Sequence, residues 1–368
     1  MSHPSRTARG VAVIRAADLL TRVTGPCRID YRRYRVPFRS PVRTAHGRWS
    51  EREGVIVRVE RPDGSTGFGE AAPVPDFARE TVDDVVGVLC AMGGGCAPDT
   101  VRTIRNGPRC LQAALRSAFL DQPLSPVESV PAYLGVAALL PAGRAVLADL
   151  PARLEAGFRL FKWKVGVGDV GDELALLDEV CGALPAGARL RLDANGAWDR
   201  RRAERWLERC AERPIEHVEQ PCLAASVDGE EARRRVDDLL LGLAGDFPTP
   251  IALDESLAGD TDVERWLNLG WPGVFVVKPA LLGDAAGSLD QLRKRKAPVV
   301  FSSSLETAVG ARAALRAAFR WDGAPRALGF GVWPLFADPL FDGPRSAPFI
   351  RREDVEAIDA EAVWNAIG

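Results

Sequence analysis

FKWKVG at 161–166 and RLRLDANGAW at 189–198 are apolar, β-prone segments separated by a helical spacer, and they indicate the fold class. In the first, Lys162 and Lys164 stand two residues apart, so on a strand both side chains point to one face. Asp193 and Asn195 repeat this spacing at the end of the second segment. Polar side chains on one face of two successive strands predict a site at one edge of a sheet.

Three later strand-like segments also end in ionisable residues. IEHVEQP contains Glu219, PIALDES contains Asp254 and Glu255, and GVFVVKP contains Lys278. Each lies about one strand–helix unit after the previous one. Burying lysines and carboxylates at the ends of apolar strands is costly unless they pair or bind a metal. Five such units predict an α/β barrel with an active site at its C-terminal mouth.

The remaining segments predict how the chain is divided. Alternating residues around an Asp63-Gly64 turn predict antiparallel strands between Cys27 and Glu70, and apolar helical spacing follows at 81–120. The polar segment SPVRTAHGRWSERE, 40–53, is expected to be a mobile hairpin loop, and the barrel is expected to begin at VPAYLGVA, 130–137. The predicted parts are an N-terminal extension (1–26), an α+β capping domain (27–125), the barrel (126–328) and a tail packing on the capping domain (329–368).

Composition excludes several classes of function. The net charge of −2 argues against binding nucleic acid or a membrane surface through bulk electrostatics. No apolar stretch approaches the roughly 18 residues that span a bilayer, and no GxGxxG motif follows a strand, so no dinucleotide site is expected. The seven cysteines are an odd number without a CxxC pair. They are typical of reduced thiols and predict a cytoplasmic protein.

Asp193, Glu219 and Asp254 are hard oxygen ligands on three consecutive strand ends. Converging carboxylates cannot all stay ionised without a cation between them. All-oxygen ligation favours Mg²⁺, with Mn²⁺ as the alternative ion. The competing interpretation is a set of separate salt bridges around the rim of the barrel.

Lys164 and Lys278 lie on strands that flank the carboxylates, so both are candidate catalytic residues. A lysine beside another cation and a metal has a lowered pKa, which suits a general base near neutrality. Lys162 is the neighbour expected to lower the pKa of Lys164, and it joins the catalytic set. Arg191 is expected one layer deeper. Lys162 and Arg191 also fit a purely structural or solvated role.

Several residues near the mouth are candidate substrate contacts. Ser and backbone N–H groups before a helix can bind an anion, although Ser also favours plain N-caps. Asn195 fits either a neighbour of the metal ligands or a helix cap. The full candidate set is Asn195, Arg191, Glu255, Ser302, Ser303, Ser304, Glu306 and His46.

The order of motifs KxK, DxN, ExP, DES and VKP resembles the enolase superfamily, in its muconate-lactonizing-type branch. The resemblance covers the chain from about Cys27 onward. It implies a modified (β/α)₇β TIM-like barrel under an α+β capping domain that the C-terminal tail completes. It also implies the metal ligands and catalytic lysines already named, and therefore an active enzyme on a small carboxylate substrate.

The capping segments TAHGRW and GFGEAAPVPDFARET are similar to those of the o-succinylbenzoate synthase family, with Val74 and Asp76 as departures. The resemblance implies Mg²⁺-dependent dehydration of 2-succinyl-6-hydroxy-2,4-cyclohexadiene-1-carboxylate in menaquinone synthesis. Lys164 would be the base and Lys278 a cation over the π-system. Loops 41–50 and 71–81 would close over the substrate.

Three alternatives stay open beside the dehydratase interpretation. A racemase or epimerase of N-acylated amino acids or dipeptides would use both lysines as bases. A Schiff-base lyase would use one lysine as nucleophile and would not need three carboxylates. A non-catalytic binding protein on this scaffold would not need the intact set of lysines and carboxylates.

Overall fold

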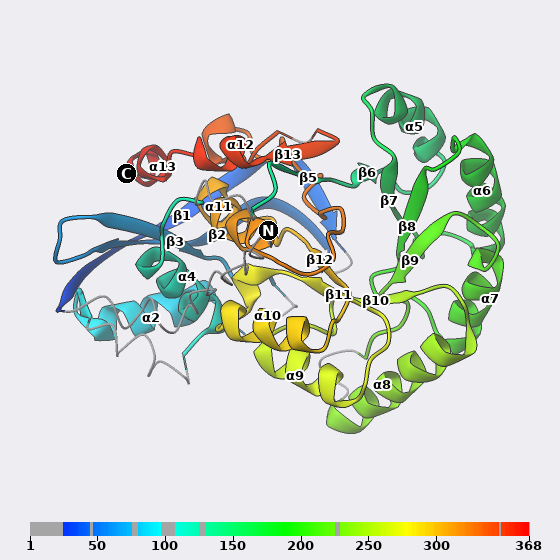
Figure 1. Ribbon diagram of the computed structural model, residues 1–368, viewed down its shortest axis with the longest axis horizontal. Coiled ribbons are helices and arrows are strands. Elements are labelled where there is room, and N and C mark those ends of the chain that lie inside the picture. Colours follow the sequence, from blue (N-terminus) through cyan, green and yellow to red (C-terminus); the bar gives the residue numbers. More distant parts are fainter. Residues whose placement is uncertain are drawn as a thin grey trace, which may run out of the picture.

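The computed structural model describes residues 25–44, 47–75, 80–96, 107–124, 130–224, 229–345 and 347–367. A curled parallel sheet wrapped by helices lies beside a four-stranded antiparallel sheet (Figure 1). Among the described residues no helix combines the length and the apolar character needed to cross a bilayer.

The antiparallel sheet is formed by the first third of the chain. Its strand order is β3-β2-β1-β4, and two helices pack on one face through an apolar cluster. A Cβ at Gly69 would lie 1.9 Å from the Ala114 carbonyl oxygen, so only glycine lets the helix approach β3 this closely. The elements are β1 (Cys27–Thr44), β2 (Gly47–Glu60), β3 (Thr66–Ala71), α2 (Val82–Met92), β4 (Gly95–Cys96) and α4 (Arg109–Phe119).

The prediction of a long hairpin loop at 40–53 is wrong. Strand β1 continues to Thr44 and β2 begins at Gly47, with Val42 opposite Trp49. Most of the segment is therefore a two-stranded ribbon with a register shift between Pro37 and Val42. Both faces of its outer part are solvated, so the sequence lacks the apolar alternation by which a strand is recognised.

The parallel sheet has the order β12-β11-β10-β9-β8-β7-β6, so sequential strands are neighbours throughout. Its strands are largely buried and apolar, as expected when helices cover the outside and side chains fill the inside. The strands are β6 (Ala138–Leu140), β7 (Leu160–Lys164), β8 (Arg189–Asp193), β9 (Ile215–Glu219), β10 (Ile251–Leu253), β11 (Val274–Val277) and β12 (Val299–Phe301). The crossovers are α5 (Ala145–Glu155), α6 (Val170–Ala183), α7 (Arg200–Cys210), α8 (Gly229–Asp246), α9 (Asp260–Asn268) and α10 (Ala285–Lys294), followed by α11 (Ala308–Phe319).

A short extended segment joins the two edges of the curled sheet. Leu328 bridges Val136, just before β6, and Gly329 bridges Ser302, just after β12, both in parallel orientation. Gly329 N donates to the Phe301 carbonyl at 2.7 Å. These bridges close the sheet into a barrel, and the predicted α/β barrel with an antiparallel α+β unit beside it is confirmed.

The sequence predicts that the barrel begins near Val130, and its first strand lies a few residues later. β5 (Tyr133–Gly135) instead pairs antiparallel with β13 (Phe349–Arg351), and the barrel begins at β6. An apolar run of this length cannot reveal which partner it will pair with.

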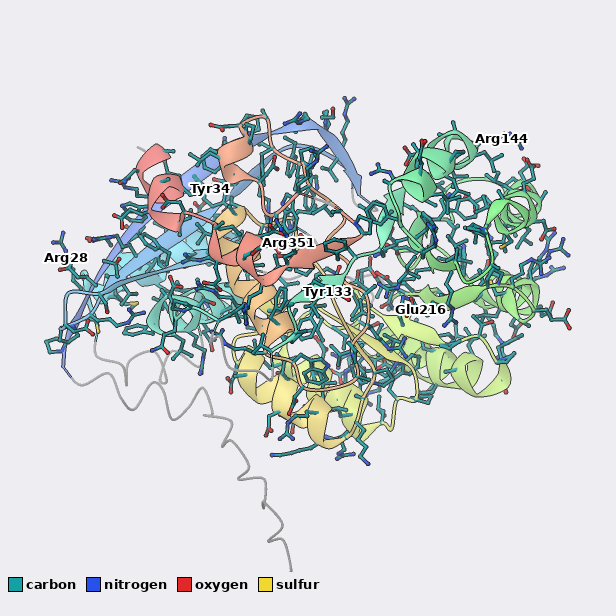
Figure 2. The ribbon with its side chains drawn as sticks, turned by 45° about the horizontal axis from the view of Figure 1, so that its top comes forward. Arg28, Tyr34, Tyr133, Arg144, Glu216 and Arg351 are labelled. Atoms are coloured by element: carbon teal, nitrogen blue, oxygen red, sulfur yellow. The ribbon has the colours of Figure 1, made fainter. Side chains whose placement is uncertain are left out.

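The C-terminal segment covers the second face of the antiparallel sheet. It contains the 3-10 helix η2 (Pro339–Phe341), α12 (Arg352–Glu356) and α13 (Ala360–Ala366). The ring of Trp364 lies 6.2 Å from that of Phe68, and Arg32 Nη1 donates to the Trp364 carbonyl at 2.6 Å. Figure 2 shows Tyr34 on β1 close to these red helices, while Glu216 lies across in the barrel.

Buried charges join α11 to Asp121, just after α4, and to α12. Arg316 Nη1 lies 2.5 Å from Asp121 Oδ1, and its Nη2 lies 2.5 Å from Glu356 Oε2. The Arg316 side chain is 8% exposed. Asp121 also pairs with Arg312 at 2.5 Å, so removing Arg316 mainly leaves Glu356 without the arginine that pairs with it.

We expect Arg316→Met to lower the free energy of unfolding by about 3 kcal/mol. Urea unfolding at one pH measures the change. Arg293→Met is the matched control, because Arg293 pairs with Asp290 on a 45% exposed side chain and such pairs contribute about 0–1 kcal/mol. Equal losses of unfolding free energy in the two variants would contradict the conclusion that the buried ion pairs of Arg316 stabilise the fold.

Candidate active site

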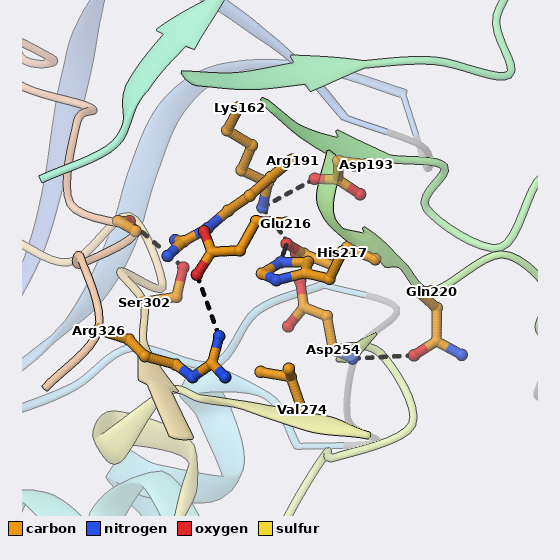
Figure 3. A network of polar contacts seen from close by, with 12 residues as sticks. Lys162, Arg191, Asp193, Glu216, His217, Gln220, Asp254, Val274, Ser302 and Arg326 are labelled. Carbon is orange, nitrogen blue, oxygen red and sulfur yellow. Dashed lines mark hydrogen bonds and ion pairs between the residues drawn. The ribbon is translucent and has the colours of Figure 1, made fainter. Parts of the chain in front are cut away.

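Carboxylates and lysines meet at the C-terminal ends of the barrel strands (Figure 3). In the parallel register Lys164 is opposite Asp193, and Asp193 is opposite Glu219. The Asp193 and Glu219 residues are 8% and 2% exposed, and Lys164 is half-buried. Strand pairing alone therefore brings three ionisable residues side by side at the mouth.

Lys162 bridges two of the carboxylates. Its Nζ lies 2.9 Å from Asp193 Oδ2 and 2.6 Å from Glu219 Oε1. Burial alone would lower the pKa of Lys162, but the two carboxylates raise it well above its ordinary value. Burial alone would likewise raise the pKa of Glu219, yet Lys162 and His217 lower it. Lys162 is thus a fixed positive charge under these acids.

A second pair of opposite charges lies on the next strands. Lys278 Nζ contacts Asp254 Oδ1. Burial lowers the pKa of Lys278 to about 7, against the carboxylates that would raise it. Both protonation states of this lysine are consequently accessible near neutral pH.

Glu255 and Asn195 extend the polar cluster. Asn195 Nδ2 donates to Glu255 Oε1 at 2.9 Å, and its backbone N–H donates to Asp193 Oδ1 at 3.2 Å. Helix α7 is capped by Asp199, so Asn195 is a neighbour of the acids rather than the helix cap. Burial, together with the negative charge of Asp193, raises the pKa of Glu255 to about 7.

The acids fit a hard divalent cation by their chemistry. Within the part of the chain that the structure describes, no three His, Cys, Asp or Glu side chains gather tightly enough to surround an ion as they stand. Asp193, Glu219 and Asp254 contact lysine ammonium groups instead. Glu255 Oε2 is buried without a hydrogen-bond partner among the described residues. The possible ligands in this cluster are all carboxylate oxygens, and the carboxylates outnumber the lysines. A bound divalent cation would balance the remaining negative charge.

Arg191 is opposite Lys162 in the parallel register, but its guanidinium points toward Glu216 rather than toward Asp193 (Figure 3). Its Nε donates to Glu216 Oε2 at 2.7 Å and its Nη2 to the Ala327 carbonyl at 2.9 Å. Arg326 holds the other oxygen of Glu216 at 3.0 Å. The contacts of Arg191 therefore connect β8 and β9 to the segment that closes the barrel. The neighbouring His217 is fully buried, and this burial lowers its pKa.

The loop after β12 binds its own carboxylate. Ser303 Oγ and Ser304 Oγ donate to Glu306 Oε2 at 3.1 and 2.7 Å, and Ser302 Oγ donates to the Gly329 carbonyl at 3.3 Å. None of these hydroxyls caps α11, whose N-cap residue is Thr307. The three serines therefore shape the loop through Glu306 and Gly329. His46 lies outside the described residues.

Residues 145–344 match the family model for enolase C-terminal domain-like proteins, and residues 28–92 match the MenC N-terminal domain. The o-succinylbenzoate synthase of Thermosynechococcus vestitus is 38% identical over 328 residues, which are 88% of this chain and 95% of that protein. The chain belongs to the o-succinylbenzoate synthase family. The o-succinylbenzoate synthase of Thermobifida fusca is 30% identical over 312 residues, which are 83% of this chain and 83% of that protein.

Solved structures agree with this family. The o-succinylbenzoate synthase of Thermosynechococcus elongatus, complexed with Mg in its active site, has a TM-score of 0.75 at 35% identity and covers 92% of this chain and 99% of its own. The L-Ala-D/L-Glu epimerase of Bacillus subtilis also has a TM-score of 0.75, covering 88% and 95%, but at 22% identity it shows the fold alone. The resemblance to the o-succinylbenzoate synthase family, with its barrel fold, is confirmed.

Two residues that sequence reasoning missed support the site in this family member. Gln220 is buried and has a backbone φ of 38°. Its side-chain oxygen accepts the backbone N–H groups of Asp254 and Ser256. Its side-chain nitrogen donates to the Cys222 carbonyl and to Ser256 Oγ. Glu173 accepts three backbone N–H groups, from residues 166–168, just after Lys164. In the sequence, Gln220 stands out only as an amide side chain directly after Glu219. Glu173 reads as an ordinary acidic residue in the first turn of a helix, so its role in holding the backbone after Lys164 could not be inferred.

Proposed function

We propose that the chain catalyses Mg²⁺-dependent dehydration of 2-succinyl-6-hydroxy-2,4-cyclohexadiene-1-carboxylate to o-succinylbenzoate, a step of menaquinone synthesis. The observation that carries the proposal is the run of lysines and carboxylates on successive strand ends, in a chain that covers 95% of a relative named for this activity. We also propose that the enzyme acts in the cytoplasm on this small carboxylate substrate and uses no nucleic acid or membrane partner.

Lys164 is the proposed general base. It removes the proton from the carbon next to the substrate carboxylate and then returns a proton to the departing hydroxyl, on the same face. A C–H bond and a C–O bond break, a C=C bond forms and water leaves. Its place beside Asp193 at the end of β7, with the following backbone held by Glu173, supports this role.

Lys278 and Lys162 are the proposed positive charges of the site. Lys278 acts as a cation against the electron-rich ring of the substrate. Lys162, held by Asp193 and Glu219, keeps those carboxylates ionised and oriented. Neither lysine needs to transfer a proton in this scheme.

Asp193, Glu219 and Asp254 are the proposed Mg²⁺ ligands. When bound, the ion supplies positive charge toward the substrate carboxylate, which makes the adjacent C–H bond more acidic. The Mg in the active site of the 35% identical structure supports this choice of ion. The lysine ammonium groups contact oxygens of these carboxylates, so the metal and the lysines are expected to compete for the same oxygen atoms.

Chelation tests the proposed function on the wild-type protein. We expect loss of the cyclohexadiene substrate, followed by its ultraviolet absorbance, to stop in EDTA and to return when excess Mg²⁺ is added. Mn²⁺ added in place of Mg²⁺ tests the alternative ion under identical conditions. Full turnover in EDTA would show that the reaction does not need the metal, and absence of turnover with Mg²⁺ would overturn the proposed reaction.

A further inference from the structure

Arg52 is a buried arginine on β2 whose described partners are all backbone carbonyl oxygens. The residue is 2% exposed. Its Nη1 donates to the Pro73 carbonyl at 2.7 Å and its Nη2 to the Ala72 carbonyl at 2.5 Å. Its Nε donates to the Leu305 carbonyl at 3.2 Å. One guanidinium therefore joins the segment after β3 to the loop after β12, which belong to opposite ends of the chain.

The loop that Arg52 holds contains a strained residue. Leu305 has a φ of 61°, in the left-handed region that residues with a Cβ rarely adopt. Ser303 Oγ accepts its backbone N–H at 2.9 Å, and Arg52 binds its carbonyl. A conformation of this kind persists only where the surroundings impose it, and such residues cluster at functional sites.

The strained loop adjoins the strand end that carries Lys278. Ser302 N donates to the Val277 carbonyl, one residue before Lys278, at 2.9 Å. This hydrogen bond fixes the start of the loop to the strand end that carries Lys278. Glu306, which collects the hydroxyls of Ser303 and Ser304, is 1% exposed and lies in the same loop.

The capping sheet holds the far end of the same loop through Glu70. Its carboxylate accepts the backbone N–H groups of Thr307 at 3.0 Å and Gly310 at 2.9 Å, at the start of α11. Tyr34 Oη donates at 2.6 Å to Glu70 Oε1, the oxygen that also accepts the Thr307 N–H, and Figure 2 shows Tyr34 on the antiparallel sheet. The sheet thus grips residues 304–310 with a buried cation and a buried anion, and Arg52 is the member that also holds the segment after β3.

We propose that Arg52 is a positioning residue that sets the loop at 302–307 against the segment at 71–75 and thereby shapes the substrate-binding wall beside Lys278. The inference deepens the proposed function and rests on it for the catalytic readout. A guanidinium fork can bind both segments at once, whereas a lysine ammonium is a single point of charge. A displacement of about 1 Å in such a wall can lower the rate about 10²-fold.

Arg61 offers a matched control at the far end of the same strand pair. Its Nη2 donates to the Ala118 carbonyl at 2.9 Å and its Nε to the Phe119 carbonyl at 3.2 Å. It therefore also binds backbone carbonyls, at the end of α4 rather than in the active-site loop, and its Nη1 donates to Ser65 Oγ at 2.9 Å. Its removal disturbs the capping sheet without touching residues 302–307.

The experiment compares Arg52→Lys, Arg52→Met and Arg61→Met in the full chain. We expect both Arg52 variants to lose about 10²-fold in kcat/KM and to show faster amide deuterium uptake in peptides covering 71–75 and 302–307. Arg61→Met is expected to stay within about twofold of wild type in kcat/KM and to show faster uptake only around α4. Thermal melting of all three, read in parallel, separates loss of fold from loss of positioning.

Two results would overturn the inference. One is an Arg52→Lys variant that keeps wild-type kcat/KM and unchanged uptake at 302–307. The other is an equal loss of activity in Arg61→Met at equal melting temperature, which would assign the effect to general destabilisation. If the wild-type chain itself shows no dehydration, the proposed function fails, and the deuterium uptake of the two segments still decides whether Arg52 positions them.

Discussion

Lys164→Arg is expected to lower the dehydration rate by at least ~10³, because arginine keeps the charge but does not release its proton near neutral pH. The proposed base must lose and regain a proton in every turnover, so preserving charge and length does not preserve the reaction. Initial rates with the cyclohexadiene substrate measure the loss, and Mg²⁺ titration of the variant checks that the neighbouring carboxylates still bind the ion.

Lys278→Arg is the companion variant, and it is expected to retain measurable dehydration. The burial that lowers the pKa of Lys278 to about 7 makes a base role chemically feasible, so the variant separates the two roles. A cation role survives replacement by arginine with some misfit of the wider group, whereas a base role does not. Equal and complete loss in the Lys164 and Lys278 variants would contradict the one-base scheme and favour a two-base racemase.

Asp193→Asn and Glu219→Gln are expected to weaken Mg²⁺ binding by at least ~10² and to abolish most dehydration. Each substitution removes a proposed charged oxygen ligand and also frees Lys162, which bridges the two residues. Calorimetric titration with Mg²⁺ measures the affinity separately from turnover, and circular dichroism checks the fold.

Glu216→Gln is the control for the carboxylate variants. Glu216 lies on the same strand as Glu219 but faces Arg191 and Arg326. Its loss is expected to lower the melting temperature while Mg²⁺ affinity stays close to wild type. Unchanged Mg²⁺ affinity in Asp193→Asn and Glu219→Gln, or a loss as large in Glu216→Gln, would show that the ion binds elsewhere.

The barrel could be predicted from the sequence because its signal is local and repeated. Each strand is a short apolar run, and each polar end recurs after one strand–helix unit, so the register of neighbours follows from the fold. The pairing of Lys164 with Asp193 is an example. The antiparallel ribbon at 40–53 could not be predicted, because its solvated faces erase the alternation on which strand prediction depends.

The supporting contacts could not be predicted because they join distant parts of the chain. Arg52 and Leu305 meet across more than half of the sequence, and nothing in the local pattern around either residue indicates the other. Lys162 stands in a KxK motif, but only the structure shows that its ammonium bridges Asp193 and Glu219. Side-chain partners of this kind depend on tertiary packing rather than on propensity.

The proposed dehydratase function is tested on the wild-type protein with saturating Mg²⁺. Dehydration of the cyclohexadiene carboxylate is compared with solvent-deuterium exchange at the α-carbon of N-succinyl amino acids. We expect a kcat/KM for dehydration in the enzymatic range of about 10⁴ M⁻¹s⁻¹ or above, and exchange at least ~10² slower. Rapid exchange into the amino acids without formation of o-succinylbenzoate would contradict the proposed function.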